Sequence, residues 1–119
     1  MSLSLFSVSV DCGDAAKLAG FWSEVLGREV DAGGSEAFSS IGMHAGGADG
    51  PAFLFHQVPE GKTAKNRLHV DFVAPHLAEE VDRVVSLGAT KLAEVAEDGY
   101  QWVTVADIEG NEFDIIAAP

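Results

Sequence analysis

One pattern occurs twice in this chain. Residues 5–27 and residues 67–88 each begin with a short alternating segment, continue after a break as a helical stretch, and end in Leu-Gly. Strand-like segments follow each Leu-Gly pair. Internal repeats of this kind determine the architecture of a chain. We therefore predict an α+β fold of two strand–helix–strands modules, residues 1–60 and residues 66–119, with two sheets side by side around a cleft.

Hydrophobic periodicity places the elements of the first module. Residues 4–11 alternate as a half-buried strand whose polar face carries Ser7 and Ser9. A helix is expected after Asp14, which suits an N-cap, and before Gly27, which suits a C-terminal cap. Its apolar stripe consists of Leu18, Phe21, Trp22, Val25 and Leu26. Further strands are predicted at residues 28–31, 36–42 and 51–58.

The second module repeats this order. Residues 67–73 alternate, with Arg67, His69 and Asp71 on one face and Leu68, Val70 and Phe72 on the other. A helix with the apolar stripe Leu77, Val81, Val84 and Val85 follows. Strands are predicted at residues 89–96, 100–106 and 112–117. In the last strand, Phe113 and Ile115 are expected to face the helix, and Glu112, Asp114 and Ile116 the opposite side.

Composition narrows the range of partners and locations. The chain has 119 residues, a formal net charge of −12 and 47% hydrophobic residues, which is typical of a globular domain. The negative charge disfavours nucleic acid and anionic membranes as partners. No stretch has the apolar length of a membrane span, and the single cysteine, Cys12, excludes a disulfide framework within the chain. We expect a cytoplasmic protein.

The order of three segments resembles a known superfamily. These segments are VDCGDAAKLAGFWSEVLG near the start, NRLHVDF at mid-chain and DIEGNEFDI near the end. Together they resemble the vicinal-oxygen-chelate superfamily, which includes glyoxalases, bleomycin-resistance proteins and extradiol dioxygenases, and most of all its glyoxalase-like domain proteins. The resemblance covers essentially the whole chain. It implies two βαβββ modules whose sheets curl around a shared cleft.

The resemblance also implies a metal site, with one ligand from the first strand of each module and one from a later strand. His69 matches the ligand of the second module's first strand, and Asp114 stands where a ligand glutamate is usual. Ser7 replaces the expected ligand of the first module's first strand, and a serine hydroxyl is a poor ligand. His56 is the best candidate for the remaining position. The implied set of His56, His69 and Asp114 suits one divalent ion of Zn, Ni, Fe or Mn.

Other residues are candidates for the lining of the cleft. They are Ser7, Ser9, Arg67 and Asp71 on the same predicted faces, and Trp102, whose face the pattern leaves open. Glu112 or Asp114 is the candidate general base, whereas Asp71 is placed to orient the His69 imidazole. The alternative for Asp71 is a structural hydrogen bond or an ion pair, and for His69 a cleft-wall histidine hydrogen-bonded to a neighbour.

Three classes of function remain open. The first is a metal-assisted lyase, isomerase or oxygenase acting on a chelating small molecule. The second is a non-catalytic protein of the bleomycin-resistance type that sequesters a ligand, and the third is an accessory dimer without a small ligand. A true glyoxalase I is disfavoured, because Ser7 and Asp114 depart from its ligands. Short single-domain members of the superfamily usually dimerise, and exposed sheet edges need covering, so a homodimer is expected.

Overall fold

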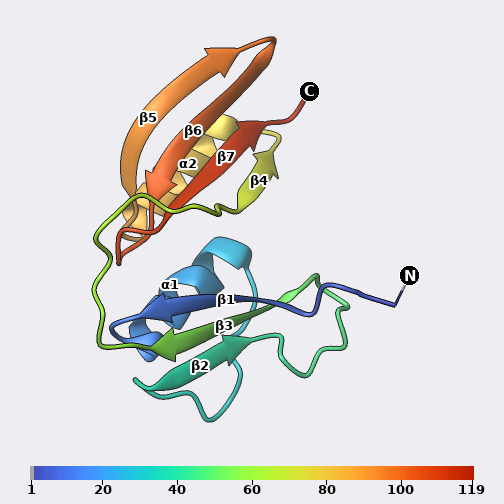
Figure 1. Ribbon diagram of the computed structural model, residues 1–119. Coiled ribbons are helices and arrows are strands. Elements are labelled where there is room, and N and C mark those ends of the chain that lie inside the picture. Colours follow the sequence, from blue (N-terminus) through green and yellow to red (C-terminus); the bar gives the residue numbers. More distant parts are fainter. Residues whose placement is uncertain (1) are drawn as a thin grey trace. The chain divides into compact units, whose positions relative to one another are not determined.

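The computed structural model describes residues 2–119, which form two compact units that divide between Gly61 and Lys62 (Figure 1). We call them module 1 and module 2. Module 1 contains β1 (Ser7–Cys12), α1 (Ala15–Leu26), β2 (Phe38–Ile41) and β3 (Ala52–Gln57). Module 2 contains β4 (Asp71–Ala74), α2 (Leu77–Ser86), β5 (Thr90–Glu97), β6 (Tyr100–Ala106) and β7 (Glu112–Ala117).

Module 1 is a sheet of order β1-β3-β2 with α1 along one face (Figure 1). β1 and β3 are parallel, whereas β2 and β3 are antiparallel. The strand predicted at residues 28–31 is reduced to one bridge, between Val30 and Ile41. α1 begins after Asp14, whose carboxylate accepts a hydrogen bond from the Lys17 amide at 3.1 Å, and ends at Gly27 with φ 65°.

Module 2 repeats this connectivity with a complete set of strands. Its sheet has the order β4-β7-β6-β5, with β4 and β7 parallel and the other pairs antiparallel. α2 covers one face of this sheet (Figure 1), and Val81, Val84, Phe113 and Ile115 are buried. The predicted α+β fold of two βαβββ modules is thus confirmed. None of the helices within residues 2–119 is long and apolar enough to cross a membrane.

The cores of the modules are aromatic. In module 1, Trp22 is 4% exposed, its ring stacks on Phe53 with centroids 5.7 Å apart, and Phe21 meets it edge-on at 5.8 Å. In module 2, Phe72 and Phe113 form an edge-to-face pair at 6.0 Å. Such pairs add to the stabilisation that comes from burying their area. Trp22 therefore belongs to the core, as the helical stripe predicted.

Two apolar residues are more exposed than predicted. Leu68, expected on the apolar face of a strand over residues 67–73, is 90% exposed, because the strand does not begin until Asp71. Asn66 Nδ2 donates to the carbonyl oxygen of Glu112 at 3.0 Å, which ties this segment to the start of β7. Val85 is 42% exposed, because it lies at the edge of the α2 stripe, beside the buried Val84.

Gly42 gives a stability prediction for module 1. Its φ is 71°, and a Cβ there would lie 2.1 Å from Arg28 Nη2, whose guanidinium donates through Nη1 to the carbonyl oxygen of Pro51 at 2.8 Å. A methyl group at Gly42 must displace this guanidinium. We expect Gly42→Ala to lower the free energy of unfolding by roughly 1–3 kcal/mol more than Gly33→Ala does. Chemical denaturation measures both variants.

Gly33 is the matched control, because its φ is also positive, at 87°, but the space around a Cβ there is open. Both substitutions carry the backbone strain of a non-glycine residue in this region. Their difference isolates the displacement of Arg28. Equal losses in the two variants would show that Arg28 relocates without cost.

Candidate functional site

The two faces of the module 2 sheet differ in character. Side chains alternate between the faces of a strand, and Phe113 and Ile115 of β7 are buried on the side of α2. Glu112, Asp114 and Ile116 therefore point to the opposite side, which we call the open face. This confirms the faces that the sequence predicted for β7.

Strand register aligns three polar side chains in a row across the open face. Asp71 of β4 lies opposite Asp114 of β7, which in turn lies opposite Thr104 of β6. We call Asp71, Asp114 and Thr104 the polar row. Like charges directly opposite each other on adjacent strands are destabilising, so the two aspartates favour a cation between them.

His69 meets both of these aspartates. It lies two residues before Asp71, just ahead of β4, and its Nδ1 is 2.9 Å from Asp71 Oδ1 and 3.3 Å from Asp114 Oδ2. The hydroxyl of Thr104 donates to Asp114 Oδ1 at 2.6 Å. One ligand atom from each of His69, Asp71 and Asp114 lies within 4.8 Å of the others. This convergence makes the group a candidate metal centre.

The group opens into a hollow of about 420 Å³ in module 2. This volume falls within the range of small-molecule sites, about 300–1,000 Å³. Asp114 lines it with only 13% of its side chain exposed, whereas the His69 side chain is 40% exposed. The lining residues are Lys65, His69, Asp71, Trp102, Thr104, Glu112, Asp114 and Ile116.

Glu112 lies in the hollow, where its ionised carboxylate forms an ion pair and accepts a hydrogen bond. Lys62 Nζ is 3.2 Å from its Oε2, and the Asn66 amide donates to the same oxygen at 3.4 Å. Burial acts to raise the pKa of Glu112, but backbone and Lys62 hydrogen bonds, together with the Lys62 charge, hold that pKa below its usual value. These contacts hold the segment of residues 62–66 against β7, and the lowered pKa makes Glu112 a weaker base than an ordinary glutamate.

Removing the Glu112 charge gives a pH-dependent prediction. A lowered pKa in the folded state stabilises the fold above the unfolded-state pKa, near 4.5, and this stabilisation disappears as the pH falls through the folded-state value. We expect Glu112→Gln to lower the free energy of unfolding by about 1 kcal/mol at pH 7. The difference from wild type should shrink below pH 4.5. Urea denaturation at several pH values measures this, and a pH-independent difference would contradict it.

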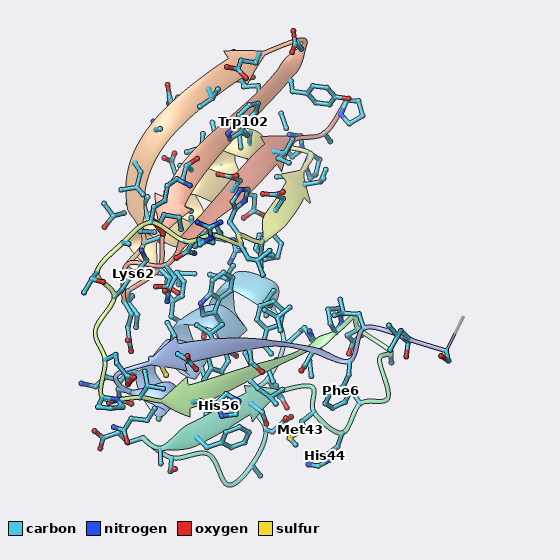
Figure 2. All side chains as sticks on the ribbon, in the orientation of Figure 1. Phe6, Met43, His44, His56, Lys62 and Trp102 are labelled. Atoms are coloured by element: carbon cyan, nitrogen blue, oxygen red, sulfur yellow. The ribbon has the colours of Figure 1, made fainter. Side chains whose placement is uncertain are left out.

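The structure gathers most of the predicted site residues of the second module. His69, Asp71, Glu112, Asp114 and Trp102 all line the hollow. Arg67 is exposed in the segment before β4, and Lys65 supplies the basic side chain at the hollow instead. Figure 2 shows Trp102 on the sheet of module 2.

The remaining predicted residues lie in module 1. Ser7 and Ser9 are on β1 and His56 is on β3, all on the sheet face opposite α1, because their neighbours Phe53 and Phe55 are buried on the helix side. The His56 ring packs against Phe38, with centroids 5.1 Å apart. Figure 2 shows His56 on the module 1 sheet. That His56 ligates a metal, and that Ser7 and Ser9 line a ligand cleft, stay predictions.

Three contributors differ from the predicted site. Asp71 was expected to line the cleft and to orient His69 or act structurally, and it is positioned as a third ligand. Lys65 was predicted only as one residue of a basic loop with Lys62 and Arg67, either solvated or holding an anionic group, and Thr104 was not singled out. The alternation of residues 100–106 places Thr104 on the same face as Trp102, which was a usable signal. Lys65 lies in an irregular segment, where no periodicity indicates direction.

Comparison with known proteins agrees with this architecture. The family model described as "Glyoxalase-like domain" matches residues 7–116. The chain therefore belongs to the glyoxalase-like domain family, within the vicinal-oxygen-chelate superfamily that the sequence resembles. No curated protein matches the chain.

Solved structures share the fold at low sequence identity. One is a glyoxalase/bleomycin resistance protein/dioxygenase family enzyme from Burkholderia phytofirmans, with a TM-score of 0.79 and 16% identity. The match covers 98% of this chain and 100% of that enzyme's chain. FosX, a fosfomycin resistance protein of Listeria monocytogenes, was solved as a variant with Mn(II) and 1S,2S-dihydroxypropylphosphonic acid. FosX has a TM-score of 0.75 and 14% identity. The match covers 100% of this chain and 92% of the FosX chain. TioX from Micromonospora sp. ML1 has a TM-score of 0.63 and 15% identity. The match covers 97% of this chain and 98% of TioX.

Proposed function

We propose that this protein binds a small molecule through one divalent metal ion held on the open face of module 2. The observation that carries the proposal is the convergence of His69, Asp71 and Asp114, whose ligand atoms lie within 4.8 Å of one another. One imidazole and two carboxylates form a donor set suited to Mn, Fe, Ni or Zn. FosX, which has the same fold, was solved with Mn(II), and this supports the choice of manganese as the first ion to test.

The distances within the group fit a metal centre. Two ligand atoms that each lie about 2.1 Å from one ion are separated by about 3 Å in tetrahedral or octahedral geometry. The separations of 2.9 Å and 3.3 Å between His69 Nδ1 and the two carboxylates agree with this spacing. A divalent ion would also offset the repulsion between Asp71 and Asp114. The residues present therefore fit the metal that the family implies.

The polar and charged residues of the hollow each have a proposed role. The metal supplies Lewis acidity toward a substrate with two neighbouring oxygen atoms. His69, Asp71 and Asp114 hold it, and the Thr104 hydroxyl fixes the orientation of the Asp114 carboxylate. Lys65 offers a positive charge to an anionic group of the substrate, and Glu112 is the proposed base, weakened by its lowered pKa. This chemistry suits a lyase, an isomerase or a dioxygenase.

The protein is proposed to act as a cytoplasmic homodimer.

A second candidate function is sequestration of a ligand without chemistry. It is favoured by the apolar side chains of Trp102 and Ile116, which line the hollow beside the polar row. A sequestering protein of the bleomycin-resistance type would bind one ligand per site and release it unchanged. Product analysis after prolonged incubation with a bound ligand separates this function from an enzyme.

Elemental analysis tests the metal proposal directly. The protein is purified without chelators, and its Mn, Fe, Ni and Zn contents are measured and compared with the protein concentration. We expect about one divalent ion per chain, or stoichiometric uptake when Mn(II) or Zn(II) is titrated calorimetrically. Protein that is metal-free as purified and takes up neither ion in the titration would overturn the proposed function.

A further inference from the structure

The irregular segment ahead of β4 is fixed at both of its ends to one residue of β7. Lys62 Nζ lies 3.2 Å from Glu112 Oε2 and also donates to the carbonyl oxygen of Ala64, which folds the segment back on itself. Asn66 reaches the same glutamate twice, because its backbone amide donates to Oε2 at 3.4 Å and its side-chain Nδ2 donates to the carbonyl oxygen at 3.0 Å. We call residues 62–66 the tether.

Lys65 lies between the two attachment points of the tether and lines the hollow. Unlike Lys62, it forms no ion pair and no hydrogen bond with any of residues 2–119. The carboxylates of the hollow are already engaged, Glu112 by Lys62 and the two aspartates of the polar row by His69. The positive charge of Lys65 is therefore available to a ligand.

The tether changes what a lysine at this place can contribute to recognition. An exposed loop is usually mobile, and holding a long side chain in one place costs conformational entropy at the moment of binding. A segment that is ordered before binding avoids much of this cost. The contacts of Asn66 and Lys62 with Glu112 order the backbone on both sides of Lys65, so they reduce the cost of placing its ammonium group at the hollow.

We propose that the tether makes Lys65 a specificity-determining residue, which selects ligands that carry an anionic group in addition to the group that binds the metal. Asn66 and Lys62 are positioning residues, because they act on the ligand only through Lys65. The inference rests on the proposed function, since the metal held by the polar row and His69 binds the other end of the ligand. It assigns to the tether, rather than to the sheet, the discrimination between charged and neutral ligands.

Two chelators that differ only in charge test the inference. Succinic monohydroxamic acid and its primary amide carry the same hydroxamate on the same chain, which ends in a carboxylate in the first and in a neutral carboxamide in the second. Their affinities are measured by calorimetry for protein loaded with whichever of Mn(II) and Zn(II) it takes up. We expect the wild type to bind the acid about tenfold more tightly than the amide, through a charge-assisted hydrogen bond from Lys65.

Single substitutions separate the tether from positive charge in general. Lys65→Gln should bring the ratio of the two affinities toward one, and Lys65→Arg should largely keep it. Asn66→Ala should reduce the ratio to about two or three, because Lys65 is present but no longer held. In Asn66→Ala the affinities for the metal and for the amide should not change, a pattern that a collapsed site would not give. Arg67→Gln is the matched control and should keep the wild-type ratio, because Arg67 is exposed and is not among the residues that line the hollow.

Trypsin provides a readout of the tether itself. The bond after Lys65 is cleaved when the segment leaves its fixed conformation, so this cut should be several times faster in Asn66→Ala than in the wild type. Mass spectrometry measures the rate, relative to the same cut in the urea-unfolded chain, which corrects for the changed sequence.

The outcomes separate this inference from the proposed function. Equal or undetectable affinities of the metal-loaded wild type for the two chelators would overturn the inference and leave the proposed function intact. A ratio that stays unchanged in Asn66→Ala, or that falls equally in Arg67→Gln and Lys65→Gln, would also overturn it, as would unchanged cleavage after Lys65 in Asn66→Ala. If the wild type takes up neither Mn(II) nor Zn(II), the proposed function fails, and this inference fails with it.

Discussion

Replacing Phe113 by alanine is expected to lower the free energy of unfolding of module 2 by about 3–5 kcal/mol. Phe113 is 1% exposed and is among the largest fully buried side chains of the protein. It meets Phe72 edge-to-face, so its removal deletes an aromatic pair and leaves a cavity beneath the open face. Domains are stable by about 5–15 kcal/mol, so this loss is a large share of the total.

The two tryptophans make this prediction measurable module by module. Trp22 lies in module 1 and Trp102 in module 2, so urea denaturation followed in Trp22→Phe and Trp102→Phe backgrounds reports on each module separately. Phe113→Ala should shift the Trp102 transition, and Phe55→Ala, a matched core change in module 1 at a residue 0% exposed, should shift the Trp22 transition. Phe113→Leu is the milder control. A loss below 1 kcal/mol in Phe113→Ala would mean that the core beneath the site is not tightly packed.

Local patterns were sufficient to predict most of the fold. The alternation of residues 112–117 identified β7 and its faces, because a strand half covered by a helix repeats its polarity every two residues. The apolar stripe containing Trp22 identified α1, because a helix packed on a sheet repeats its polarity every three to four residues. The start of β4 was misplaced, because residues 67–70 also alternate. The strand begins only at Asp71, where pairing with Asp114 of β7 starts, and local polarity does not reveal that long-range pairing.

The sequence indicates only those features of the site that depend on which face of a predicted strand a residue occupies. His69 and Asp114 were expected on one face on this basis, and His69 Nδ1 lies 3.3 Å from Asp114 Oδ2. The place of Asp71 beside them depends on the register of two parallel strands that are separated by a helix and two other strands. Such register is set by the packing of the whole module.

Replacing Asp114 by asparagine is expected to reduce the affinity for Mn(II) by more than about 100-fold. Changes to residues that only support metal ligands typically cost 10–100-fold, and a ligand should cost more. Asparagine keeps the size of the side chain and can still accept the hydrogen bond of Thr104, so the loss reports the missing charge rather than a collapsed site. His69→Ala should have an effect of similar size. Calorimetric titration of Mn(II) measures each variant, with circular dichroism to verify folding.

Asp82→Asn is the matched control, because Asp82 is an exposed aspartate on α2, on the other side of the sheet from the open face. This variant removes the same charge from the chain. It should keep the affinity for Mn(II) within about twofold of the wild-type value, since exposed charges at a distance are screened by salt. Unchanged affinity in both Asp114→Asn and His69→Ala would place the metal elsewhere or exclude it from this site.

Asp71→Asn then decides between the two roles that its geometry allows. If Asp71 is a ligand, its replacement should match Asp114→Asn, because each variant removes one of two carboxylates from the ion. If Asp71 instead orients the imidazole through the 2.9 Å contact with His69 Nδ1, the loss should stay within 10–100-fold. In the second case the imidazole would hold the ion through Nε2, because Nδ1 would be engaged by Asp71.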